Sequence, residues 1–432
     1  MNHDRFENMF EGTKGIIVFS LFFWLSIIFL VGTHLRSREG DLEPGIDWLV
    51  MVQIVFSIAA VCLAVLLIIL SKNPLGYGSK ILIFYVIAAG LSALFSNYTF
   101  TVIGYWMLLL GISLLTIALV QRVKSEKALD MIENTWLILV TIMLLKDLIT
   151  FYLIGNTSIN GETTRLGTGV THSNAMSLQA VLAYILSLDG EKKRPKYIWL
   201  LRFFFIFIII GSRTRIAMLA FIFGNIIYAF FKARKYQYLG IIILSSFFVI
   251  VLLYFLGLSI DISFIKNTFN SFNRNQDLET LMSLSRRTDI WDLAIYKIKH
   301  RPLENHLFGS GYGVTRLVLN ENSRTALFFY AYHCHNVVLQ HILAMGIFGV
   351  IPYIALVIYS LKWFITINNS REYFSERFQL HAIVIITIFF LISITEVPIG
   401  GKINPNVVLY LFYIISLDRL NQLRGDNPSF ES

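Results

Sequence analysis

The stretch IIIGSRTRIAMLAFIFG, residues 208–224, sets two arginines between two apolar runs. An arginine at the centre of a membrane helix costs about 2.5–3.5 kcal/mol on insertion scales. Arg213 and Arg215 therefore belong at the membrane boundary, in a polar turn between two spanning helices. The stretch predicts a helical hairpin with a basic turn, and the rest of the chain repeats its apolar pattern.

The composition fixes the fold class. Of the 432 residues, 56% are hydrophobic and 15% are charged, whereas soluble domains carry about 25% charged residues. Apolar segments recur that are long enough to cross about 30 Å of hydrocarbon. We predict an all-α polytopic integral membrane protein, which excludes a large soluble catalytic domain. The two cysteines, Cys62 and Cys334, do not suggest a disulfide framework.

About twelve membrane helices are expected, with one large, partly helical loop before the tenth. The expected spans are 15–33, 47–70, 80–96, 99–121, 135–155, 172–189, 197–211, 214–231, 238–259, 335–361, 378–396 and 405–418. The chain then divides into helices 1–9 (1–259), the loop (260–334), and helices 10–12 with a tail (335–432).

Basic residues indicate the orientation. Lys and Arg gather in alternate loops such as SKNPLGYGSK, DGEKKRPK and FKARKYQ, which the positive-inside rule assigns to the cytoplasm together with both termini. The start, MNHDRFENMFEGTKG, reads as a cytoplasmic tail before a retained helix, not a signal peptide. The same placement explains the net charge of +9 without nucleic acid. The Arg213/Arg215 turn and the 260–334 loop then face the periplasm. Arginines between helices are more often cytoplasmic anchors, but that reading would put every later loop on the wrong side.

The long loop contains a predicted helix and a glycine-rich turn. In SLSRRTDIWDLAIYKIKHRPL, residues 283–303, apolar residues recur at helical spacing. Arg286 and Arg287 lie at its N-terminus, where they oppose the helix dipole, so an anionic partner becomes more plausible. FGSGYG, residues 308–313, predicts a flexible turn and is too weak a signal for a nucleotide site.

Histidines precede the next helix. His333, His335 and Asn336 stand at the start of an apolar run, with His341 further in. Their spacing matches no common zinc pattern, so we expect no metal and no cofactor. A surface histidine suits proton transfer or hydrogen bonding to an anion, against the alternative of an interfacial histidine satisfied by backbone. Glu396, at the outer end of the eleventh span, is a candidate for positioning a guanidinium.

In order and spacing these motifs resemble the O-antigen polymerase and O-antigen ligase superfamily (Wzy- and WaaL-like proteins, with related protein oligosaccharyltransferases). The matching elements are RLGTGVTHSNAMSL (165–178), TRIAML (214–219), Arg287 to Trp291, Pro302 with FGSGYG, HNVVL (335–339), and the glycines from Gly346 to Gly349. The resemblance covers about residues 165–350. It implies a metal-independent glycosyltransferase of the GT-C type, facing the periplasm from the bacterial inner membrane.

The resemblance also implies residue roles. Arg215 and Arg287 would grip the pyrophosphate of an undecaprenyl-pyrophosphate-linked glycan, and His335 would orient or deprotonate the acceptor hydroxyl. Further substrate contacts are expected from Arg213, Arg286, His333, Asn336, Trp291 and Arg165. The arginines are doubled at both places, so the acting member of each pair stays open. Attack opposite the leaving group would invert the anomeric centre.

Three functions remain open. We favour a polymerase that adds lipid-linked glycan to a growing glycan, with membrane lipids and a chain-length regulator as partners. A ligase would instead transfer the glycan to lipid A-core or to a protein. A transporter or flippase would use the arginines only to bind an anionic substrate, but the chain lacks the matched broken helices of repeat-built transporters.

Overall fold

The computed structural model describes residues 13–31, 48–71, 73–123, 125–154, 166, 173–188, 197–232, 287–321, 331, 333–369, 376–397, 399–400 and 404–426. Within these ranges every regular element is a helix. This is the expected architecture, because a helix satisfies its backbone hydrogen bonds within one segment when no water is present. The all-α polytopic prediction is confirmed.

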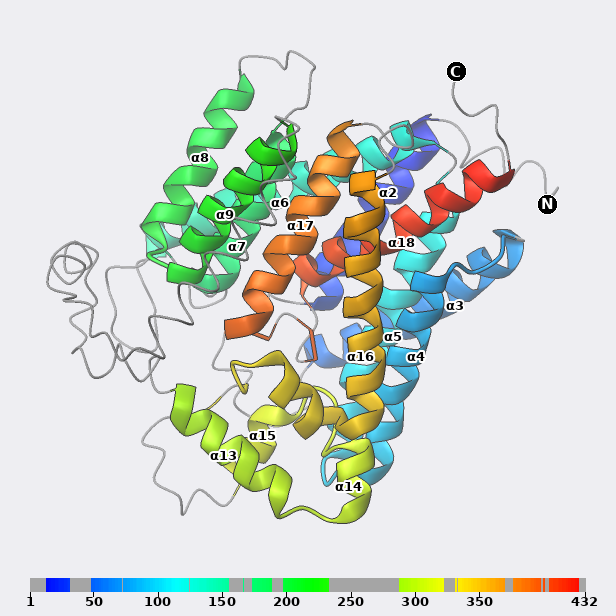
Figure 1. The fold of residues 1–432 in the computed structure, drawn as a ribbon, viewed down its shortest axis with the longest axis vertical. Coiled ribbons are helices and arrows are strands. Elements are labelled where there is room, and N and C mark those ends of the chain that lie inside the picture. Colours follow the sequence, from blue (N-terminus) through cyan, green and yellow to red (C-terminus); the bar gives the residue numbers. More distant parts are fainter. Residues whose placement is uncertain are drawn as a thin grey trace, which may run out of the picture.

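Membrane-length helices form the bulk of the molecule, and three short helices cover one end (Figure 1). The long and medium helices are α2 (Thr13–Val31), α3 (Trp48–Ser71), α4 (Tyr77–Leu91) continued by the 3-10 turn η2 (Ser92–Phe95), α5 (Thr99–Gln121), α6 (Glu126–Ile154), α7 (Ser173–Ser187), α8 (Tyr197–Gly211), α9 (Arg215–Lys232), α16 (Val337–Asn369), α17 (Glu376–Thr395) and α18 (Pro405–Asp426). The short helices are α13 (Arg287–Lys299), α14 (Leu303–Phe308) and α15 (Thr315–Asn320).

Eleven of the twelve expected spans coincide with one of these helices, while the span at 238–259 lies outside the described residues. By length and composition, six described helices qualify as membrane spans, and three shorter apolar helices accompany them. The count of twelve therefore stays a prediction. Two predicted spans differ in character from the rest: α7 has 15 residues and is mostly buried, and α18 is buried continuously from Val407 to Leu420.

Helix α16 is broken inside the molecule. Gly346 has φ 62° and ψ −159°, a conformation open almost only to glycine. The break leaves carbonyl groups of the preceding turn without helical partners. Arg301 donates from Nη1 to the carbonyl oxygen of Ile342 at 2.8 Å, and the backbone N–H groups of Ser310 and Gly311 donate to those of Leu343 and Ala344. A polar loop thus completes the short N-terminal half of α16.

The two glycine motifs fit each other at this break. A Cβ added to Gly309 would lie 2.3 Å from the backbone of Ala344, and one added to Gly346 would lie 2.4 Å from the carbonyl oxygen of Leu307. FGSGYG is therefore a packed, hydrogen-bonded segment, which corrects the expectation of a flexible turn. Its glycines are needed for close backbone approach.

We expect Gly346→Ala to destabilise the protein by about 2–3 kcal/mol, because alanine is strained at this φ and its methyl group meets backbone. Thermal unfolding of detergent-purified protein measures the loss. Gly104→Ala is the matched control, since nothing lies within 4 Å of its added Cβ and the site is inside α5. Equal melting temperatures for the two variants would contradict the account of the break.

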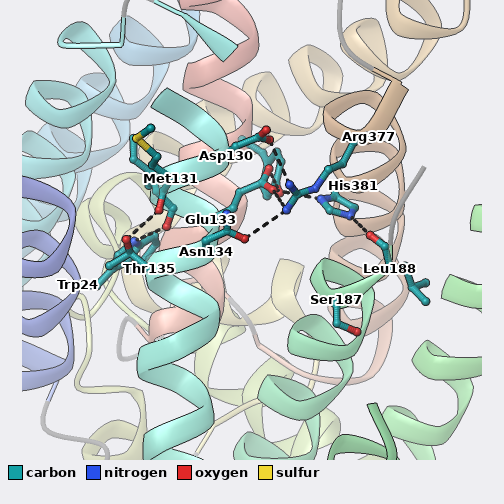
Figure 2. A network of polar contacts seen from close by, with 12 residues as sticks. Trp24, Asp130, Met131, Glu133, Asn134, Thr135, Ser187, Leu188, Arg377 and His381 are labelled. Carbon is teal, nitrogen blue, oxygen red and sulfur yellow. Dashed lines mark hydrogen bonds and ion pairs between the residues drawn. The ribbon is translucent and has the colours of Figure 1, made fainter. Parts of the chain in front are cut away.

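A buried polar network joins α6, α7, α17 and α18 near the first turns of α17, the end of that helix away from Glu396 (Figure 2). Glu133 of α6 has a fully buried side chain and lies 3.4 Å from Arg377 and 3.2 Å from His381, both of α17. The hydroxyl group of Tyr413 in α18 donates to Glu133 at 2.5 Å. His381 Nε2 donates to the carbonyl oxygen of Leu188, just after α7, at 3.0 Å. A guanidinium, an imidazole and a hydroxyl group therefore surround the buried carboxylate, and a buried charge requires such polar partners.

Candidate functional site

The candidate site begins with the turn that leads into α16. The Oδ1 atom of Asn336 accepts hydrogen bonds from the backbone N–H groups of Val338 and Leu339, both at 3.0 Å. Asn336 is therefore the N-cap of α16, a role typical of asparagine. Its predicted role as a substrate contact stays a prediction.

His335 has a strained backbone. Its φ is 48°, and among the described residues Arg213, with φ 50°, is the other non-glycine residue at positive φ. Such conformations cost about 1–3 kcal/mol and cluster at functional sites. Both strained residues were sequence-predicted site residues.

Glu396 is the centre of the cluster. It follows the last turn of α17, and its side chain is 14% exposed. Its Oε1 atom accepts from Arg287 Nη2 at 3.0 Å, and its Oε2 atom lies 3.3 Å from His335 Nδ1 and 3.8 Å from His333 Nε2. The structure thus brings together Arg287, His333 and His335, and the proposed contact of Glu396 with a guanidinium is present.

The neighbours of Glu396 hold it ionised. Burial by itself raises its pKa, but the hydrogen bond with His335 and the charges of His333, His335 and Arg287 outweigh burial and set the pKa below the usual value of a glutamate. The carboxylate is therefore negative at neutral pH. It accepts hydrogen bonds and donates none.

The contacts also indicate where the ring protons are. His333 Nδ1 accepts from the backbone N–H of His335 at 3.2 Å, so the proton of a neutral His333 is on Nε2. His335 Nδ1 lies 3.3 Å from Oε2 of Glu396, and the negative charge of the carboxylate favours the tautomer of a neutral His335 that has its proton on Nδ1. The Nε2 atom of His335 then keeps its lone pair. A carboxylate that fixes the tautomer of a histidine in this way prepares the ring to act as a general base.

His333, His335 and Glu396 are also a donor set that a metal ion is able to use, since their ligand atoms lie within 4.8 Å of one another. Two contacts favour protons instead. The guanidinium of Arg287 occupies Oε1 of Glu396. A metal on His333 Nε2 would also force the ring proton onto Nδ1, toward which the N–H of His335 points.

Asn174 of α7 also contacts the carboxylate of Glu396, and Thr214, just before α9, contacts Asn174. Asn174, in the first turn of α7, donates from Nδ2 to Glu396 Oε1 at 3.4 Å, and its Oδ1 accepts from Thr214 Oγ1 at 3.5 Å. Thr214 immediately precedes Arg215, the first residue of α9. Within the described part of the chain, the guanidinium groups of Arg213 and Arg215 form no hydrogen bond or ion pair, and Arg213 is exposed. Asn174 lay in a quoted sequence motif, but no sequence signal linked it to Glu396.

The remaining predicted residues form no hydrogen bond or ion pair with Glu396 within the described part of the chain, or lie outside it. Trp291 donates from Nε1 to the carbonyl oxygen of Cys334 at 2.9 Å, so it supports residues 333–336, the histidine turn that leads into α16. His341 is buried, with Nδ1 at 2.7 Å from the carbonyl oxygen of Val337 and Nε2 at 3.1 Å from the hydroxyl of Tyr85, as in a satisfied core histidine. Arg165 and Arg286 lie outside the described residues.

These features define a class: a multi-pass helical membrane protein with an arginine, two histidines and a glutamate gathered at one end of the bundle. Residues 200–354 match the family model described as O-antigen ligase. The match covers α8, α9, the short helices and the histidine turn, and it supports the O-antigen ligase and polymerase superfamily predicted from the motifs. Residues 200–354 are thus similar to O-antigen ligases. No curated protein matches it.

Proposed function

We propose that this protein transfers a glycan from a polyprenyl-pyrophosphate carrier to an acceptor hydroxyl at the periplasmic face of the bacterial inner membrane, without a metal ion. The observation that carries the proposal is the Glu396 cluster, which sets an oriented histidine beside an arginine at the end of a helical bundle. The both-termini-inside orientation predicted from the loops is part of the proposal.

The donor side of the reaction is assigned to the arginines. A lipid pyrophosphate on C1 of the sugar is already a good leaving group, so the site chiefly has to stabilise the charge of the departing diphosphate. Arg215 has no partner within the described residues and begins a helix, whose N-terminus also favours anions. Arg287 donates from Nη2 to Glu396, and its side chain is 21% exposed. Arg213, Arg286 and Arg165 remain secondary candidates.

The acceptor side is assigned to His335. Its Nε2 lone pair takes the proton of the attacking hydroxyl, and Glu396 stabilises the imidazolium that forms. Because attack on C1 comes opposite the leaving diphosphate, the product is expected to have the inverted anomeric configuration. His333 is a second candidate for this role, and Asn336 and Trp291 remain proposed substrate contacts.

Two candidate functions differ in the acceptor that receives the glycan. A polymerase would use a growing lipid-linked glycan, which the 165–178 stretch favours by its resemblance. A ligase would use lipid A-core or a protein, and the description of the matching family model favours this alternative. Deleting the gene and separating the surface glycan on a gel distinguishes them. A polymerase deletion leaves one repeat on the acceptor, a ligase deletion leaves lipid-linked polymer and no modified acceptor, and a flippase deletion leaves neither.

Replacing the arginines tests the donor assignment. Arg215→Ala and Arg287→Ala are each expected to lower the transfer rate by about 10²-fold or more, because each removes a charge donor to the leaving group. Arg202→Ala is the control, since Arg202 binds the end of α7 opposite Asn174, through the Ser187 carbonyl. A normal glycan ladder in the first two strains, at normal protein level, rejects the assignment.

A further inference from the structure

Gln340 is a buried junction below the histidine turn. Gln340 is only 1% exposed, and its side-chain amide makes three hydrogen bonds. Oε1 accepts from the backbone N–H of Cys334 at 3.1 Å, while Nε2 donates to Thr315 Oγ1 at 2.6 Å and to the carbonyl oxygen of Gly400 at 3.2 Å. Gln340 therefore ties the histidine turn to α15 and to the segment that follows Glu396.

Trp291 also binds the backbone of Cys334, at its carbonyl group. Its Nε1 atom donates to the carbonyl oxygen of Cys334 at 2.9 Å. Trp291 lies one helical turn after Arg287 on α13, so the arginine and the indole are carried by one rigid element. Both backbone groups of Cys334, the residue between the two histidines, are thus fixed by side chains.

The positive φ of His335 makes this arrangement significant. A strained turn persists only where its surroundings over-determine it. Resting on the proposed function, we propose that Gln340 and Trp291 are positioning residues, which clamp the Cys334 backbone so that His335 meets Glu396 in the orientation needed for proton transfer. Neither side chain is required to touch the substrate in this role.

The clamp predicts a kinetic signature. Gln340→Ala is expected to lower kcat about 10–100-fold while changing KM for the lipid-linked donor less than threefold, since a misplacement of about 1 Å costs up to 10²-fold in rate. Trp291→Phe, which keeps the ring and removes the N–H donor, should show a smaller loss of the same kind. The donor is the polyprenyl-pyrophosphate-linked glycan extracted from the deletion strain.

Gln121→Ala is the matched control. Gln121 is also a buried glutamine with both ends of its amide bonded, to Ser71 and to the backbone of Asn73, but it lies at the end of α5. Its removal is expected to lower stability without changing kcat. An equal fall in kcat for Gln121→Ala and Gln340→Ala would reduce the clamp to general stability and overturn the proposal.

A second readout does not depend on transfer activity. Cys334 is fully buried, and burial raises the pKa of its thiol to about 12, so it should react slowly with a maleimide in the intact clamp. In a Cys62→Ser background, Gln340→Ala should accelerate this labelling about tenfold or more, while Gln121→Ala should not. Unchanged labelling contradicts the clamp.

The outcomes separate the clamp from the proposed function. If His335→Ala retains the wild-type rate, the base assignment fails whatever Gln340 does. If His335→Ala is inactive and Gln340→Ala is kinetically normal, the clamp alone is wrong.

Discussion

Glu396→Gln is expected to lower kcat for glycan transfer by about 10²–10⁴-fold, the range seen when the carboxylate that orients a catalytic histidine becomes an amide. The amide does not stabilise the imidazolium of His335 and no longer fixes its tautomer. It also leaves Arg287 without its charge partner. Transfer from the extracted lipid-linked glycan by purified protein measures the effect.

Glu304→Gln is the matched control, because Glu304 is an exposed glutamate on α14 whose replacement leaves the cluster intact. Its rate should equal that of the wild type. A folded Glu396→Gln protein with a rate within twofold of the wild type would remove Glu396 from the mechanism.

The stability of the same variant should depend on pH with a defined sign. Because the pKa of Glu396 is lowered in the folded protein, its charge contributes stability above the ordinary pKa of a glutamate, and this contribution is lost as the pH falls through the lowered value. The difference in free energy of unfolding between wild type and Glu396→Gln is therefore largest at neutral pH. It should shrink on acidification.

The second large effect is expected at the opposite end of α17. Glu133→Ala should lower the free energy of unfolding by about 3–5 kcal/mol, because it leaves the buried His381 without its carboxylate and removes the buried one of the two carboxylates of Arg377. The hydroxyl group of Tyr413 loses its acceptor as well. Unfolding of the detergent-solubilised protein by increasing dodecyl sulfate measures the loss.

Asp130→Ala supplies the comparison within the same network. Asp130 lies 3.5 Å from Arg377, but its side chain is 37% exposed, so its removal should cost less than about 1 kcal/mol. Similar losses for Asp130→Ala and Glu133→Ala would show that burial does not determine the strength of this network.

Hydropathy predicted the helices well, because a helix that crosses the hydrocarbon core needs a continuous run of apolar residues, which is visible in the sequence. It did not distinguish α18, whose residues face protein on all sides, from helices that face lipid on one side. The broken helix was also invisible to it. FGSGYG and the glycine at 346 are separated by more than thirty residues in sequence, and only tertiary packing shows that each makes room for the other.

Site residues could be predicted from the sequence where their side-chain chemistry marked them. Contacts between residues far apart in the sequence could not. Arg287, His333 and His335 stood out as charged or titratable residues at helix starts, and the structure gathers them. Glu396 was suggested as a partner for an arginine, but its contact with His335 joins segments about sixty residues apart in the sequence. Gln340 gave no signal at all, because a glutamine in an apolar helix reads as a tolerated polar residue until its three partners are known.

The position of α18 has a consequence for biogenesis. This helix packs against α2, α4, α5, α7, α16 and α17, and every one of them precedes it in the chain (Figure 1). During translation, the earlier helices enter the membrane before their common neighbour has been synthesised. The contacts of α18 therefore form after the contacts that the earlier helices make among themselves.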